Sequence, residues 1–131
     1  MALLIVRLGT PRHPEEGLRI GTVRRPPRGV PKAEFGSRDF YDVWYPQLSP
    51  SQPLVSQALS ATTDREWAAF VRAFRKEMAT PDARHALDLL AALSHTTNLS
   101  VGCYCEDENR CHRSVLRELF TDAGAALVQE R

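Results

Sequence analysis

The stretch of the chain that is richest in reactive side chains spans residues 98–124 and reads NLSVGCYCEDENRCHRSVLRELFTDAG. Within it, Cys105 stands between a predicted strand and a predicted helix, close in sequence to Arg110 and Arg113. A helix amino terminus and neighbouring positive charge lower the pKa of a thiol and favour the nucleophilic thiolate. We therefore predict Cys105 as a catalytic nucleophile and His112, the nearest side chain suited to proton transfer, as its acid or base.

The turn from Cys105 to Arg113 also favours binding of an anion. In a parallel sheet, ligands gather where strands end and helices begin, because backbone N–H groups and the helix dipole point there. Arg110 and Arg113 lie in or before the first turn of the helix, where the dipole disfavours cations. Two explanations stay open: the arginines bind an anionic ligand, or they pair with the acidic side chains of residues 106–108 in a solvated network.

The same cysteines allow other interpretations. Cys103 and Cys105 are two apart on a strand and face the same way, and Cys103 is expected in the core. With Cys111 and His112 they could bind zinc, but a one-residue gap followed by a five-residue gap lacks the usual ligand spacing. We therefore expect no metal and no cofactor. A redox pair of Cys105 and Cys111 is another alternative, although the two-residue spacer of redox motifs is missing. In the alternative, His112 is a half-buried structural histidine that hydrogen-bonds to the end of the cysteine strand.

The rest of the chain must supply the elements that position this stretch. Apolar or alternating runs predict strands at residues 2–8, 18–23, 40–45 and 99–104. A capping box from Thr63 to Glu66 begins one helix, Pro81 begins the next, and Gly124 ends the last one. A late strand that is reached through helices is most easily placed in a parallel sheet. We therefore predict a single compact α/β domain over residues 1–131, with a mostly parallel sheet covered by helices.

A basic loop occupies residues 24–32 and reads RRPPRGVPK, with four basic side chains, three prolines and no carboxylate. The prolines exclude a helix and restrict the loop, so its guanidinium groups lose less entropy when they bind a ligand. We expect this loop to approach the turn at Cys105 and to clamp an anion through Arg24 and Arg28. In the alternative, the loop and aromatic residues 40–45 bind single-stranded nucleic acid, although such aromatic side chains more often belong to the core.

Composition limits the classes of partner. The 131 residues carry 17 basic and 16 acidic side chains, so the net charge of +1 gives no general attraction to DNA or membranes. The apolar run from Ala2 to Val6 is too short for a signal peptide or a membrane span. All three cysteines lie between positions 103 and 111, which excludes a disulfide framework across the fold. We expect a cytoplasmic protein with reduced thiols and no membrane partner.

Four segments of the chain together resemble a known family. They are GLRIGTVRRPPRGVPK at 17–32, FYDVWYPQLSPS at 40–51, the helix of Trp67, and SVGCYCEDENRCHRSVL at 100–116. Over nearly the whole chain, this combination resembles the domain of unknown function 488 family of small bacterial and archaeal proteins. The resemblance implies a compact α/β fold and supplies no reaction. As site residues it marks Arg24, Arg28, Gly29, Pro50, Ser51, Cys105, Cys111, His112, Arg113 and Ser114.

The sequence thus predicts recognition of a small phosphate- or nucleotide-like anion at a strand-to-helix turn, with thiol chemistry at Cys105 and His112. The predicted ligand-binding residues are Arg24, Arg28, Arg110, Arg113 and Ser114. The alternatives are a non-catalytic module that binds nucleic acid or protein, and a structural zinc site.

Overall fold

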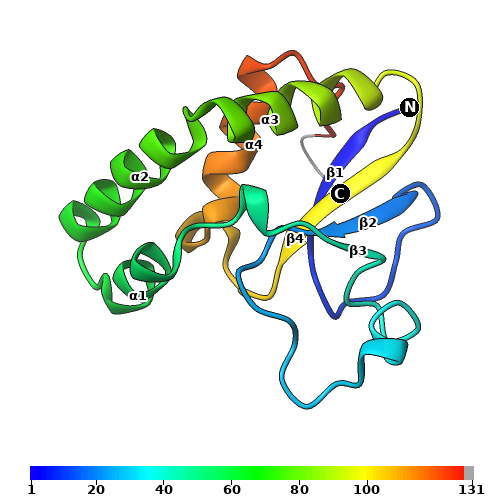
Figure 1. The fold of residues 1–131 in the computed structure, drawn as a ribbon, viewed down its shortest axis with the longest axis horizontal. Coiled ribbons are helices and arrows are strands. Elements are labelled where there is room, and N and C mark those ends of the chain that lie inside the picture. The colour runs from blue at the N-terminus through cyan, green and yellow to red at the C-terminus, as the bar shows by residue number, and fades with distance from the viewer. Residues whose placement is uncertain (129–131) are drawn as a thin grey trace.

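The apolar runs of the sequence form a four-stranded sheet in the computed structural model, which describes residues 1–128 (Figure 1). The strands are β1 (Leu3–Arg7), β2 (Leu18–Gly21), β3 (Val43–Trp44) and β4 (Leu99–Cys103), in the spatial order β1-β4-β2-β3. All pairs are parallel, and Leu99 of β4 lies opposite both Leu3 and Leu18. The predicted α/β class with a parallel sheet is confirmed, although β3 is shorter than residues 40–45 suggested.

Four helices accompany the sheet. They are α1 (Gln52–Ser60), α2 (Asp64–Met78), α3 (Pro81–Leu93) and α4 (His112–Asp122), and short 3-10 turns span Lys32–Glu34, Pro46–Leu48 and Glu108–Arg110. The capping box of α2 is confirmed. The Thr63 hydroxyl oxygen accepts from the Glu66 N–H over 3.1 Å, and the Glu66 carboxylate accepts from the Thr63 N–H over 3.1 Å. After α4, Gly124 adopts a φ of 82°, which is the left-handed conformation that ends a helix.

Sequence patterns did not predict α1. Ser51 precedes this helix as its N-cap residue and a proline follows in its first turn, and both are signals for a helix start. The apolar pattern was weak, because no residue of α1 is buried and only Leu54 and Ala58 pack partly against the core.

The main core lies between the sheet and three of the helices. It joins alternate residues of β1 and β4 to the inner faces of α2, α3 and α4, including Leu3, Ile5, Leu99, Val101, Phe70, Phe74, Leu87, Leu116 and Phe120. A second cluster contains Leu4 and Val6 of β1, which pack with Tyr41 from the connection between β2 and β3. Because side chains alternate along a strand, β1 contributes to both clusters.

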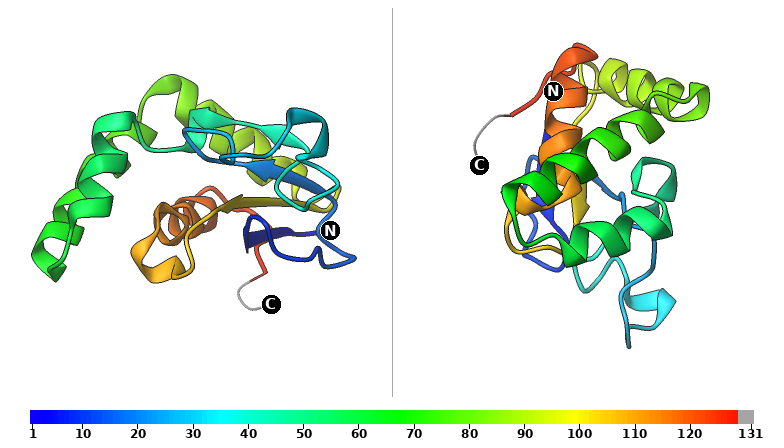
Figure 2. Two further views of the ribbon diagram at one scale, coloured as in Figure 1. Left: turned by 90° about the horizontal axis from the view of Figure 1, so that it is seen from below. Right: turned by 90° about the vertical axis from the view of Figure 1, so that its left-hand side faces the viewer.

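The parallel order of the strands determines where a site can form. The segments that follow β2 and β4 leave the sheet at the same edge, because parallel strands share one carboxyl end. The helices α1 and α2 lie side by side beyond that edge (Figures 1 and 2). None of the helices within residues 1–128 combines the length and apolar character that crossing a membrane requires.

Candidate active site: a pocket with a cysteine–histidine floor

A pocket of about 710 Å³ opens at the edge where β2 and β4 end. The basic loop forms one wall from Arg24 to Arg28, and side chains of α1 and Phe70 of α2 form others. Its floor comes from the end of β4 and the segment that follows, and contains the half-buried Cys105 and the buried Cys103, Cys111 and His112. The fold therefore brings the basic loop to the cysteine turn, as we expected from their places in the sequence.

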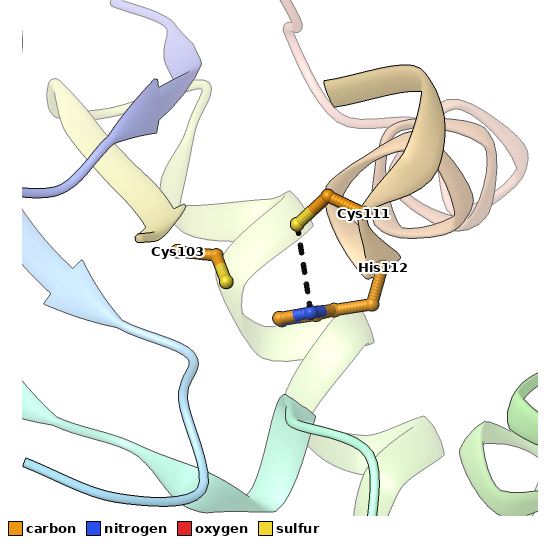
Figure 3. Close-up of side chains that lie close together, drawn as sticks. All are labelled: Cys103, Cys111 and His112. Atoms are coloured by element: carbon orange, nitrogen blue, oxygen red, sulfur yellow. Dashed lines mark hydrogen bonds between the residues drawn. The ribbon is translucent and has the colours of Figure 1, made fainter. Parts of the chain in front are cut away.

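Three soft donor atoms converge in the floor (Figure 3). Cys103, Cys111 and His112 each offer one such atom, these atoms lie within 4.8 Å of one another, and all three side chains are buried. The Sγ of Cys111 is 3.8 Å from Nδ1 of His112. The Sγ of half-buried Cys105 is 3.7 Å from that of Cys103. We call these four residues the cysteine–histidine cluster; all three cysteines are free thiols.

The orientation of the His112 ring is fixed by one hydrogen bond. His112 is the first residue of α4, and its Nε2 lies 2.6 Å from the carbonyl oxygen of Thr22, just after β2. A carbonyl oxygen only accepts, so Nε2 donates, and in the neutral ring the lone pair is then on Nδ1, beside Cys111. The ring also meets Phe74 edge-on, with centroids 5.6 Å apart. His112 is thus buried and hydrogen-bonded, and its free nitrogen faces the cysteines.

The three thiols influence one another's ionisation. Hydrogen bonds from Cys103 and Cys105 lower the pKa of Cys111, and the His112 ring acts in the same direction against the effect of burial. Hydrogen bonds to Cys105 and Cys111, together with burial, raise the pKa of Cys103. For Cys105, the bond with Cys103 acts to lower the pKa, but the bond with Cys111 and burial outweigh it and raise the pKa. The contacts within the cluster therefore favour the thiolate at Cys111 and disfavour it at Cys103 and Cys105.

Arg113 and Ser114 do not line the pocket; they support its floor from α4. The Arg113 side chain is buried, and its Nη2 donates to the carbonyl oxygen of Cys105 over 2.5 Å. The Ser114 hydroxyl donates to the carbonyl oxygen of Cys111 over 2.9 Å. Both side chains therefore hold the backbone of the cysteine segment in place.

Arg113 differs from Arg19, which is also buried, in how its charge is balanced. Arg19 is paired with Glu16, whose carboxylate accepts from Nε and Nη2 over 2.9 Å each. Within residues 1–128 no carboxylate pairs with Arg113, and its buried Nε has no hydrogen-bond partner. An unpaired buried charge is costly, and it favours negative charge on the groups around it. Arg113 therefore favours an anionic group in or above the cluster.

The arginines of the pocket wall differ in how many hydrogen bonds hold their side chains in place. Arg24 donates from Nε to the Pro50 carbonyl oxygen over 3.0 Å and from Nη2 to two further carbonyl oxygens, so it anchors the loop to the segment before α1. Arg25 donates from Nε to the Gln52 side chain over 3.2 Å. Arg28 is exposed, and no hydrogen bond or ion pair engages it within the described residues. Of the predicted ligand-binding arginines, Arg28 therefore has the guanidinium group that is most free to bind a ligand.

Arg110 is held by α2 and not by its acidic neighbours. Its guanidinium pairs with Asp64 and lies 5.8 Å from the centroid of the Trp67 ring. The carboxylate of Glu108 instead pairs with Arg117, at 2.7 Å. The alternative in which Arg110 and Arg113 pair with residues 106–108 is therefore wrong, since neither arginine makes such a pair.

Sequence reasoning missed the part that Tyr104 plays. Its side chain lines the pocket, and its hydroxyl donates to the Arg25 carbonyl oxygen over 3.0 Å, which ties the cysteine segment to the basic loop. The aromatic residues 40–45 do not form one stacking surface. Phe40 lines the pocket, Tyr41 is buried, and the half-exposed Trp44 donates its indole N–H to the Val23 carbonyl oxygen over 2.8 Å.

A protein-family model matches most of the chain. The family model DUF488-N3a, described as the active DUF488-N3 subclade, matches residues 3–124. No curated protein and no solved structure matches the chain significantly.

Proposed function

Because the chain belongs to the DUF488-N3a family, the active DUF488-N3 subclade, we propose that it is an enzyme that binds a phosphate-bearing small molecule in the arginine-lined pocket. The description of the subclade as active is in keeping with a chemical role. The family name supplies no substrate, so the class of ligand is inferred from the charge and size of the pocket.

The charge of the pocket carries the proposal. Four arginines line it, Arg24, Arg25, Arg28 and Arg110, and none of its lining residues is acidic, although Arg110 is paired with Asp64 at its edge. The chain as a whole has a net charge of only +1, so this positive charge is local to the pocket. Guanidinium groups suit phosphate because they donate two parallel hydrogen bonds in a fixed plane.

The size of the pocket favours a ligand larger than inorganic phosphate. A volume of about 710 Å³ lies within the usual range for sites that bind small organic molecules. Apolar side chains such as Val55, Leu59 and Phe40 line the walls and would accept an uncharged part of the ligand. A nucleotide combines both features, with a phosphate for the arginines and a flat base for the apolar wall.

We assign Cys105 as the residue that faces the ligand, as a thiol and not as the thiolate expected from the sequence, because its pKa is raised. It is the only half-buried cysteine, since Cys103 and Cys111 are both buried. His112 cannot act on the ligand through Nε2, because Thr22 occupies that nitrogen. The free Nδ1 of His112 points to the cysteines, so we assign this ring to the cluster and not to the mouth of the pocket.

Calorimetric titration of the whole chain with inorganic phosphate, pyrophosphate and ADP tests the proposal. The variant Arg28→Ala removes the most available guanidinium, and Arg84→Ala, on the exposed side of α3 and outside the pocket, is the matched control. We expect ADP to bind more tightly than inorganic phosphate. Arg28→Ala should weaken ADP binding about tenfold, or about 1.4 kcal/mol, and Arg84→Ala should leave it unchanged.

Two results would overturn the proposal. One is the absence of saturable binding of all three anions. The other is binding that only a single-stranded oligonucleotide shows, with an affinity that falls steeply with salt concentration. That second result would favour the alternative function, a module that binds nucleic acid without catalysis.

A further inference from the structure

The proposed function leaves the close packing of the cysteine–histidine cluster unexplained. A nucleophilic thiol needs one cysteine, whereas the floor brings two buried thiols and a buried imidazole to within 4.8 Å of one another. We propose that Cys103, Cys111 and His112 bind one Zn²⁺ ion in the floor of the pocket. The sequence predicted no metal because it judged the ligands by their linear spacing.

The distances between the donor atoms suit a tetrahedral ion. Zinc bonds of about 2.3 Å to sulfur and 2.0 Å to nitrogen place neighbouring ligand atoms about 3.5 to 3.8 Å apart. The Sγ of Cys111 and Nδ1 of His112 are 3.8 Å apart, and the group of three closes within 4.8 Å. Movements of about an ångström would bring all three donors to bonding distance.

The support around His112 is of the kind that zinc ligands have. A histidine that binds a metal through one nitrogen usually donates from the other to a carbonyl or carboxylate, which fixes the ring. Here Nε2 donates to the Thr22 carbonyl oxygen over 2.6 Å. Nδ1 is left on the side of Cys111, as Figure 3 shows. The edge contact with Phe74 restricts the ring further.

The charges explain how the ion would serve the pocket, and this step rests on the proposed function. On binding, the thiols of Cys103 and Cys111 release their protons to solvent, and two thiolates neutralise Zn²⁺. The nearby unpaired guanidinium of Arg113 then leaves the floor positive. Three protein ligands leave a fourth position for a non-protein group, as in catalytic zinc sites. A phosphate oxygen of the ligand would take that position.

Cys105 stays outside the set of ligands in this arrangement. Its sulfur contacts Cys103 but does not belong to the group of three, and its side chain is only half-buried. A third thiolate would fill the fourth position and give the ion a negative environment. The number of thiolates on the metal is therefore the feature that separates an open, ligand-binding site from a closed structural one.

Cobalt(II) and zinc titrations of the full chain, reduced and freed of metal by a chelator, test the inference. Sulfur-to-cobalt charge-transfer absorption scales with the number of thiolates, and we expect one ion per chain with the intensity of two. Cys111→Ser and His112→Asn should weaken zinc binding by more than about 100-fold, beyond the loss typical for a residue that only supports a ligand. The control Cys105→Ser should bind zinc as the unchanged protein does.

The cobalt spectrum of the unchanged protein tests the zinc site even if a variant does not fold. Absence of a one-to-one complex would overturn the inference, and so would the intensity of three thiolates with loss of binding in Cys105→Ser. Titration of ADP into the metal-free protein separates this result from the proposed function. If the metal-free protein binds ADP and this binding still depends on Arg28, the proposed function of the arginine-lined pocket holds without the metal.

Discussion

The guanidinium of Arg113 and the backbone of Cys105 are joined by a hydrogen bond of 2.5 Å, donated by Nη2 to the carbonyl oxygen. This bond places an otherwise unpaired buried charge next to the cysteine–histidine cluster. The arginine therefore both fixes the cysteine segment and favours negative charge beside it.

We predict that Arg113→Met reduces the stabilisation that zinc and ADP confer on the protein. The neutral side chain removes the positive charge that favours the thiolates and the bound anion. The measurement is the shift in melting temperature on adding each ligand, compared with Arg75→Met. Arg75 is more exposed and pairs with Glu118 on the surface. Equal ligand-induced shifts in the two variants would contradict the role assigned to Arg113.

Alkylation should distinguish the three cysteines. Iodoacetamide is expected to modify Cys105 first, because Cys103 and Cys111 are buried while Cys105 is half-buried in the pocket. Saturating ADP should slow the modification of Cys105, and peptide mass spectrometry measures this rate. Modification of Cys111 before Cys105, or a rate that ADP does not change, would remove Cys105 from the ligand-facing position.

The pair of Arg12 and Asp42 should make stability depend on pH. The Asp42 carboxylate accepts from Arg12 over 2.8 and 3.0 Å and from the Arg19 N–H over 2.9 Å. Burial acts to raise the pKa of Asp42, but these hydrogen bonds and the charge of Arg12 outweigh it and lower the pKa. A lowered pKa means stabilisation above the unfolded-state pKa of about 3.9, and its loss as pH falls through the folded value.

The variant Asp42→Asn isolates this contribution. In urea unfolding, the difference in the free energy of unfolding between the protein and the variant should be largest near neutral pH and shrink in acid. A difference that stays constant from neutral pH to about pH 3 would show that the carboxylate charge adds no stability.

The capping box supports the wall that α2 gives to the pocket. Thr63→Ala removes the acceptor of the Glu66 N–H and should lower the free energy of unfolding by about 1 kcal/mol. The control Ser56→Ala lies on an exposed position of α1 and should change it by less than about 0.5 kcal/mol. Urea denaturation measures both, and equal small effects would mean that the box contributes little.

Local patterns in the sequence were sufficient for most of the fold. The apolar run at residues 2–8 and the capping box at Thr63 act over neighbouring residues, so they predicted β1 and α2 correctly. The helix α1 was missed because it buries no residue fully and so shows a weak apolar pattern. The length of β3 was overestimated because the aromatic residues in 40–45 lie in different environments, and only two residues of this segment form the strand.

The candidate site was less accessible to sequence reasoning because it depends on long-range contacts. Parallel strand ends predicted that the basic loop would reach the cysteine turn. Two contacts of the site join residues that are far apart in the chain: Arg110 pairs with Asp64, and His112 bonds to Thr22. No local sequence pattern predicts such contacts. Spacing along the sequence likewise does not predict the distance between the sulfur atoms of Cys103 and Cys111, because the folded turn brings these atoms to within 4.8 Å.

A crystal structure of the protein grown with zinc and ADP would locate both the metal ion and the anionic ligand. We expect an anomalous zinc peak between Cys103, Cys111 and His112, with a phosphate of ADP in the pocket between that ion and Arg28. ADP bound on another surface, with the arginine-lined pocket empty, would refute the proposed function.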